Sequence, residues 1–272
     1  PYGPLTTLGF YPLGLLSVPQ ALWVMKMVVA AASLACVWLV ALCARELGRP
    51  VVPAIVFVGL NPQLLVYTVG GAHLDVFIVL FSLLGVLAML HTRGTLAGAA
   101  VAAAAAVKAS GGLLLPFLVI GARRRRDPLF GALVAGGVLY GAGLIAWGPD
   151  LLKGISKQGN VISLRSVPGL IAQQVFGATR GTAAIGTVGA SIFIVIAVLL
   201  IARVWRGADW LTTAGWATVA LLLTLTWLMP WYIIWLLPLA ALSRSTALRR
   251  TTCAVAVVLI ALRAPTAAVL FN

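Results

Sequence analysis

The chain has 272 residues, of which 62% are hydrophobic and 9% are charged, and its mean hydropathy is +1.11. Soluble domains carry about 25% charged residues, so this chain lacks the charges needed to cover a water-facing surface. Its net charge of +14 lies in short segments between apolar runs. That pattern is typical of membrane proteins and argues against a nucleic-acid-binding protein. The composition therefore predicts an all-α protein embedded in a lipid bilayer.

The chain begins PYGPLTTLG, with neither a Met nor the pattern of a secretory signal peptide. Polytopic proteins rarely begin this way, so we expect an N-terminally truncated fragment. Apolar runs of about 20 residues, the length that crosses a bilayer, then predict a single domain over 1–272 with about eight membrane-spanning helices. These helices are expected near 20–44, 51–70, 75–92, 128–147, 186–205, 209–229, 231–243 and 251–271.

Two segments interrupt this series. In residues 95–122 the glycines of VKASGG favour a break, which predicts a short re-entrant helical hairpin. The alternative is one helix of about 28 residues. A single helix would place Arg93 and the arginines of 123–126 on opposite sides of the membrane, so we favour the hairpin. The polar residues 148–185 are expected to form an external loop.

The hairpin gives the basic residues a consistent orientation under the positive-inside rule. The residues that then share the cytoplasmic side are all arginines: Arg45, Arg49, Arg93, Arg123, Arg124, Arg125, Arg126, Arg203, Arg206, Arg244, Arg249 and Arg250. The residues that fall on the outer side are Lys26, Lys108, Lys153, Lys157, His73, Asp75, Asp150 and Arg165. We therefore expect a multi-pass plasma-membrane protein whose polar chemistry faces outward.

The stretch VYTVGGAHLDVFIVLF places His73 and Asp75 between two predicted spans, just after a pair of glycines that break the helix. One interpretation makes Asp75 the N-cap of the following helix. The other makes it a carboxylate facing a cavity at membrane level, with His73 as its hydrogen-bonding neighbour. In that position Asp75 would be a candidate general base for a hydroxyl group.

Lys108 lies in the apolar hairpin beside two glycines, and a lysine at membrane depth marks a candidate functional site. It could bind a phosphate as a point charge, aided by backbone N–H groups of the glycines, or extend to an interface by snorkelling. Lys26, Lys153 and Arg165 are further candidates for phosphate binding. Snorkelling explains Lys26 equally well, and an ordinary external loop explains the other two.

Two further segments could line a substrate groove. Asn61, followed by Pro62, interrupts the second predicted span, where a helix kink is the alternative. In MPWYIIWLLP the candidates are Pro230, Trp231 and Tyr232, for which an aromatic belt at the membrane interface is the alternative. The sequence contains neither a glycine-rich nucleotide motif nor a cluster of metal ligands, so we expect no cofactor and no metal.

The order PYGPL, NPQLL, GGAHLD, AAVKASGGLLLPFL and MPWYIIWLLPL resembles the GT-C superfamily of integral-membrane glycosyltransferases. Within that superfamily it resembles the actinobacterial polyprenol-phosphomannose-dependent α-mannosyltransferases. The resemblance implies a GT-C-like fold and transfer of a mannosyl or related residue at the outer membrane face. The donor would be a polyprenyl-phosphate sugar and the acceptor a mannan or lipoglycan. His73 and Asp75 match the family's H-x-D stretch, Lys108 its hairpin lysine, and 230–232 its PWY segment.

The chain departs from the superfamily pattern in one respect. Enzymes of the GT-C superfamily usually carry a catalytic Asp or Glu in the first external loop, and PYGPL resembles the end of that loop. No acid precedes PYGPL here. Either this acid lies upstream of Pro1, which we favour, or Asp75 or Asp150 takes its place. In the first case Asp75 would be a supporting residue.

Two other classes of protein are compatible with a basic, apolar chain. A transporter or flippase of lipid-linked substrates also carries charges at membrane depth, but it should show two related halves, and no internal repeat is visible in the sequence. A structural membrane protein would need neither Lys108 nor the H-x-D pair. Loss of sugar transfer on changing Lys108 would separate the enzyme from both.

Overall fold

The structure is a computed structural model that describes residues 2–149, 163, 165–176 and 182–262. Within these ranges every regular element is a helix and no strand occurs, which confirms the predicted all-α class. In the N-terminal part the elements are α1 (Pro4–Phe10), η1 (Tyr11–Leu15), α2 (Val18–Glu46), α3 (Val51–Gly59), η2 (Gln63–Val69), α4 (Val76–Leu90), α5 (Gly94–Val107), η3 (Ala109–Leu114), α6 (Leu115–Gly121) and α7 (Arg126–Trp147).

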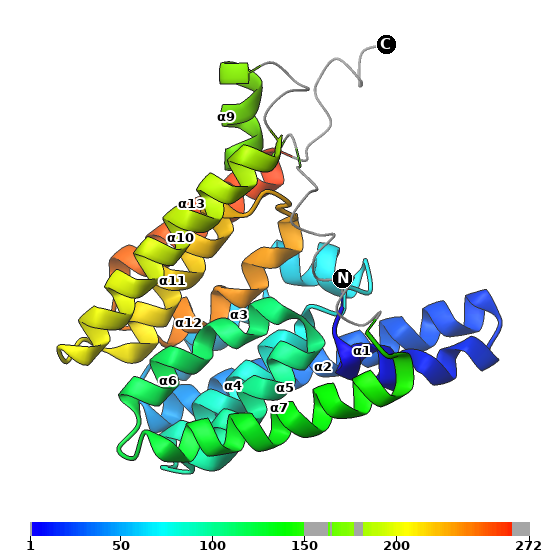
Figure 1. Cartoon of the computed structure of the whole chain (residues 1–272), viewed down its shortest axis with the longest axis horizontal. Helices are drawn as coiled ribbons and strands as arrows, with labels where there is room; N and C mark the ends of the chain where they lie inside the picture. Colours follow the sequence, from blue (N-terminus) through cyan, green and yellow to red (C-terminus); the bar gives the residue numbers. More distant parts are fainter. Residues whose placement is uncertain (1, 150–162, 164, 177–181, 263–272) are drawn as a thin grey trace.

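The C-terminal elements are α9 (Val167–Phe176), α10 (Thr182–Trp205), α11 (Trp210–Thr224), η4 (Pro230–Trp235), α12 (Leu237–Leu242) and α13 (Thr246–Ala261). Figure 1 shows α2, α4, α5 and α7 packed side by side in one group, and α10, α11 and α13 in a second. The short helices α6 and α12 contact both groups. Of the predicted external loop, 150–162, 164 and 177–181 lie outside the described residues.

Three helical segments in the described part of the chain are long and apolar enough to cross a membrane, namely α2, α7 and 184–205 of α10. A fourth span results if α3 and η2, which meet at a bend of 44°, are counted together. The remaining apolar helices have 10–17 residues. The count of about eight spans therefore stays a prediction. The expected span 209–229 ends early, because α11 stops at Thr224.

The chain breaks and reverses after α5, as the glycines predicted, and its re-entrant position in a membrane stays a prediction. Gly111 donates its N–H to the carbonyl of Lys108, at 2.8 Å. A Cβ atom on Gly111 would overlap the backbone of Ala104, so only glycine allows α5 and η3 to approach this closely. The start of α7 packs against the start of α5, because Gly98 lies directly against Pro128. The two flanks of the hairpin therefore share one end of the molecule.

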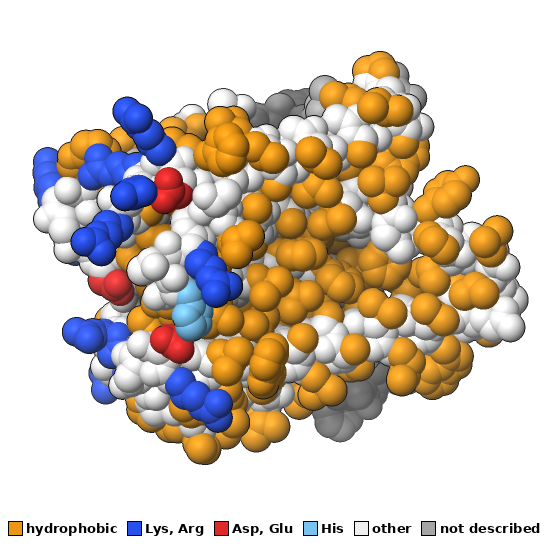
Figure 2. Space-filling view, turned by 90° about the horizontal axis from the view of Figure 1, so that it is seen from below, with side chains coloured by type: hydrophobic (Ala, Val, Ile, Leu, Met, Phe, Trp, Pro, Cys, Tyr) orange, Lys and Arg blue, Asp and Glu red, His pale blue; other side chains and the backbone are white. Residues whose placement is uncertain are grey.

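The arginine-rich segments gather at this same end. Figure 2 shows Lys and Arg side chains at one end of the molecule and an apolar surface over the rest of that face. Arg125 lies 3.9 Å from the ring centroid of Trp205, which links the hairpin to the end of α10. Arg49, Arg244 and Arg249 line one hollow. The arginines thus share one end of the molecule, as expected, and the assignment of that end to the cytoplasmic side stays a prediction.

Candidate active site

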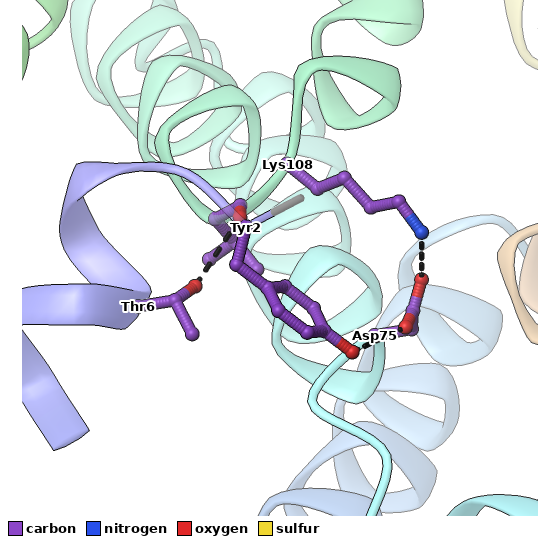
Figure 3. Close-up of polar contacts among 5 residues, drawn as sticks. Tyr2, Thr6, Asp75 and Lys108 are labelled. Carbon is purple, nitrogen blue, oxygen red and sulfur yellow. Dashed lines mark hydrogen bonds and ion pairs between the residues drawn. The ribbon is translucent and has the colours of Figure 1, made fainter. Parts of the chain in front are cut away.

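A buried carboxylate joins three segments that are distant in the sequence (Figure 3). The Asp75 side chain has no solvent exposure. Its Oδ1 atom lies 3.0 Å from Nζ of Lys108, and its Oδ2 atom accepts a hydrogen bond from the hydroxyl of Tyr2, also at 3.0 Å. The Lys108 residue is only 9% exposed. Both charges are therefore removed from water, and each has the other as its partner, as buried charges require.

The turn before α4 explains how Asp75 reaches this position. The π-helix η2 ends at Gly70 and Gly71, and His73 then donates its N–H to the carbonyl of Thr68, at 2.9 Å. A Cβ atom on Gly71 would overlap the backbone carbonyl of Tyr67, so this tight turn requires glycine. Asp75 occupies the first position before α4, but its side chain makes no capping hydrogen bond. The helix-cap interpretation of Asp75 is therefore wrong, because its carboxylate faces Lys108 and Tyr2.

The PYGPL segment places Tyr2 at the end of α5. Gly3 donates its N–H to the carbonyl of Val107 at 2.7 Å, and the Thr6 hydroxyl donates to the same carbonyl at 3.2 Å. A Cβ atom on Gly3 would overlap the carbonyl of Ala106. This close approach brings the Tyr2 ring beside Lys108, as Figure 3 shows. Burial and the neighbouring Asp75 carboxylate raise the pKa of Tyr2, which therefore keeps its proton and acts as a donor.

Aromatic rings surround the Lys108 ammonium group. Its Nζ atom lies 4.0 Å from the ring centroid of Tyr232, 5.0 Å from that of Trp235 and 5.8 Å from that of Tyr2. Tyr232 and Trp235 stack on each other with centroids 4.4 Å apart. Ring faces attract a cation, so this cage compensates part of the lost hydration. Lys108 thus does not extend to an interface, and the snorkelling interpretation is wrong.

His73 makes a different contact from the one predicted. No hydrogen bond joins it to Asp75 in the described part of the chain. Its ring instead stacks on Trp231, with centroids 3.5 Å apart and planes inclined by 14°. Burial lowers the pKa of His73, the charge of Lys108 lowers it further, and Asp75 acts in the opposite direction. His73 is therefore a neutral ring that joins the turn before α4 to η4.

A cavity of about 370 Å³ opens beside Lys108. Its lining includes residues with polar groups: Tyr2, Lys108, Ser110, Tyr140, Thr224, Thr226, Tyr232 and Trp235. Its apolar lining residues include Ala190 and Phe193 of α10 and Leu221 of α11. The Ser110 hydroxyl and the Trp235 indole N–H are buried without a hydrogen-bond partner in the described residues. These two groups could bind hydroxyl groups of a ligand.

The other predicted site residues lie away from this cavity or outside the described residues. Lys26 sits 5.5 Å from the ring of Trp23 on the same helix, and the exposed Arg165 precedes α9. The Asn61 side chain accepts a hydrogen bond from the N–H of Gln63 at the bend between α3 and η2, at 3.0 Å. None of the three lines the cavity, and Lys153 lies outside the described ranges.

Of the PWY segment only Tyr232 lines the cavity, and several other lining residues were missed. Pro230 is buried at the start of η4, Trp231 contacts His73, and Tyr232 covers Lys108. Sequence reasoning did not select Tyr2, Ser110, Tyr140 or Trp235 as site residues, although Tyr2 lies in PYGPL, Ser110 in VKASGG and Trp235 in MPWYIIWLLP. Within the described residues no group of three or more His, Cys, Asp or Glu side chains gathers.

The fold and the site together define a helical protein with apolar spans and a buried ion pair beside a cavity. Residues 1–124 match a family model described as alpha-(1->6)-mannopyranosyltransferase, N-terminal domain. The matched region includes Tyr2, Asp75 and Lys108 and stops before η4. The match covers less than half of the chain, and it shows that this N-terminal part is similar to that family of mannosyltransferases. No curated protein and no solved structure matches the chain significantly.

Proposed function

We propose that this protein transfers a mannosyl or related residue from a polyprenyl-phosphate sugar to a hydroxyl group of a mannan or lipoglycan. The reaction would take place at the outer face of the plasma membrane. The observation that carries the proposal is the position of Lys108, a buried cation that lines a cavity together with apolar side chains of α10 and α11. A lipid-linked phosphate needs both a cation for its phosphate and an apolar surface for its prenyl chain.

The chemistry assigns a definite task to the cation. The oxygen of the acceptor hydroxyl forms a bond to the anomeric carbon, and the bond from that carbon to the phosphate oxygen breaks. The electron pair leaves with the polyprenyl phosphate, and the hydroxyl proton passes to a base. Negative charge therefore grows on the phosphate, where the Lys108 ammonium group would stabilise it in a site shielded from water. The Tyr2 and Tyr232 side chains would border the same phosphate.

Asp75 fits a positioning role better than that of a general base. Each of its carboxylate oxygens already accepts from a donor, Oδ1 from Lys108 and Oδ2 from Tyr2. We propose that it fixes the Lys108 ammonium group at the cavity. His73 would act similarly through Trp231, by holding η4 in place. The proton of the acceptor hydroxyl would pass to a separate carboxylate of the kind that the GT-C resemblance implies.

The apolar lining residues of the cavity suit the donor lipid. Ala190 and Phe193 from α10 and Leu221 from α11 face the same space as Lys108. A prenyl chain placed along these helices would stay in an apolar environment while its phosphate reaches the ammonium group. The unpartnered Ser110 hydroxyl and Trp235 N–H would then be available for hydroxyl groups of the sugar.

The test is sugar transfer in membranes that contain the complete reading frame. Polyprenyl-phosphomannose and an oligomannose acceptor are supplied, and Lys108→Ala is compared with Lys26→Ala at equal protein level. Removing a group that stabilises transition-state charge costs about 100-fold or more in rate, so we expect that loss for Lys108→Ala. Lys26 lies outside the cavity, so the transfer rate of Lys26→Ala should stay near that of the wild type. Absence of transfer from any polyprenyl-phosphate sugar in the wild type would contradict the proposal and favour a transporter or flippase.

A further inference from the structure

A second hollow, of about 520 Å³, lies at the arginine-rich end of the molecule. Its cationic side is formed by Arg49, which follows α2, and by Arg244 and Arg249 at the junction of α12 and α13. Its apolar wall includes Pro53 and Phe57 of α3. The hollow shares no lining residue with the cavity at Lys108.

The positive charge in this hollow is poorly compensated. Burial lowers the pKa of Arg49, and the charges of Arg244 and Arg249 lower it further, which means that the three guanidinium groups repel one another. Asp209 acts in the opposite direction, but its carboxylate already accepts the N–H and the hydroxyl of Thr212 at the start of α11. Three positive charges thus face the single negative charge of Asp209.

One donor in the hollow has no partner. The Nε atom of Arg49 is buried and makes no hydrogen bond with any described residue. Arg249, by contrast, donates to the carbonyl of Ser243 at 2.8 Å and is held in place. A buried N–H without a partner costs free energy. An anion in the hollow would accept this hydrogen bond and reduce the repulsion among the arginines.

The location of the hollow indicates which anion fits. It opens next to the end of α2, one of the helices long enough to cross a membrane. The hollow therefore lies where the headgroups of a bilayer would surround that span. Pro53, Phe57 and Ala241 provide an apolar wall beside the guanidinium groups. A free phosphate ion would use only the cationic side, whereas a phospholipid would use both.

We propose that this hollow binds one anionic phospholipid, with the phosphate on Arg49 and Arg244 and an acyl chain along Pro53 and Phe57. Basic pockets between membrane helices bind anionic headgroups in this way. A zwitterionic lipid brings its own cation into the arginine cluster and is disfavoured. The proposal does not depend on sugar transfer, because lipid binding is measured directly and the hollow lies apart from Lys108.

The experiment measures lipid binding to the purified full chain by native mass spectrometry after delipidation. Short-chain phosphatidylglycerol, short-chain phosphatidylcholine and inorganic phosphate are added separately. The site variant Arg49→Gln/Arg244→Gln is compared with Arg45→Gln/Arg250→Gln, which removes two exposed arginines from the same end and changes the net charge equally. A hydrogen bond to a charged group contributes enough for a tenfold change in affinity. We therefore expect phosphatidylglycerol to bind at least about tenfold more weakly to the site variant, and near wild-type binding for the control.

Three results would overturn the proposal. Equal loss of phosphatidylglycerol binding in both double variants would mean that the overall charge of this end attracts the lipid, without a specific site in the hollow. Inorganic phosphate that binds as tightly as phosphatidylglycerol would mean a free-anion site. Equal binding of phosphatidylcholine and phosphatidylglycerol to the wild type would remove the role of the arginines. As a check on the apolar wall, Phe57→Gln should weaken the binding of phosphatidylglycerol and leave the binding of inorganic phosphate unchanged.

Discussion

Two positively charged regions at opposite ends of α5 differ in how their charge is accommodated. At the end of α5, Lys108 is almost fully buried, and the Asp75 carboxylate lies 3.0 Å from its Nζ atom. Near the start of α5, most arginines reach the surface. The acid that acts on Arg49 is Asp209, whose Oδ2 atom accepts a hydrogen bond from Thr212. The positive charge of Lys108 is compensated inside the protein, whereas the positive charge of the arginines depends on solvent or on an external anion.

The difference shows what burial requires of a charged side chain. Removing a charge from water costs several kcal/mol, so Lys108 can lie inside an apolar hairpin only because Asp75 and the aromatic rings surround it. A surface arginine keeps its hydration and needs no partner. Substitutions should therefore have large effects at Lys108 and its neighbours and small effects among the exposed arginines.

The largest expected effect comes from breaking the buried pair. Asp75→Asn leaves Lys108 charged and unpaired, which should lower the free energy of unfolding by about 3–5 kcal/mol. Asp75→Asn/Lys108→Met, which removes both charges, should recover most of that loss without recovering sugar transfer. Arg250→Gln, at an exposed position, should change stability by less than about 0.5 kcal/mol. Denaturant titration in mixed micelles measures the free energy of unfolding of all three variants. If Asp75→Asn lowers it no more than Arg250→Gln does, the distinction between the two regions is wrong.

The next effect concerns the close contact that positions Tyr2. In Gly3→Ala the new methyl group would overlap the carbonyl of Ala106, so the N-terminal segment must move away from α5. Overpacking of this kind lowers the free energy of unfolding by about 1–3 kcal/mol. The rate of sugar transfer should also decrease, because Tyr2 moves with the N-terminal segment. Gly9→Ala is the matched control, because a Cβ atom on Gly9 meets nothing within 4 Å. Thermal unfolding of the two variants side by side measures the difference, and equal stability would contradict the assigned contact.

A smaller effect is expected when one hydrogen bond to Asp75 is removed. Tyr2→Phe keeps the ring beside Lys108 but loses the hydroxyl that donates to Oδ2 of Asp75. Hydrogen bonds to charged groups contribute about 1.5–3 kcal/mol, and we expect the lower end because Tyr2 is partly exposed. Tyr11→Phe, at an exposed ring, provides the control. If both variants unfold at the same temperature, the hydrogen bond contributes nothing to stability.

The smallest expected effect is a pH dependence at His73. Because burial lowers its pKa in the folded protein, the unfolded chain binds more protons below the ordinary histidine pKa of about 6.5. Stability should therefore be constant above that pH and decrease as the pH falls toward the lowered pKa of the folded state. Comparing unfolding of wild type and His73→Gln across this range isolates the contribution. Parallel profiles for the two proteins would mean that His73 titrates alike in both states.

Sequence reasoning located several parts of this site before their contacts were visible. Glycines in VKASGG predicted the reversal of the chain next to Lys108, since glycine permits close backbone approach. The H-x-D stretch and the PWY segment were identified as candidates, and both lie at Lys108 in the structure. The contacts of His73 were not predicted, because its partner Trp231 comes from a segment more than 150 residues away, and pairing at such a distance leaves no local pattern.

The sequence by itself determined the helical class, the apolar character of the long helices, the chain reversal after α5 and the gathering of arginines at one end. These features depend on composition and local pattern, namely the length of apolar runs, helix-breaking glycines and the placement of charge. Only the tertiary structure decided that Asp75 binds Lys108 and Tyr2 instead of capping α4, and that aromatic rings from η4 enclose the ammonium group. The physical reason is that a buried charge selects its partner by proximity in space, and the packing of distant helices sets that proximity.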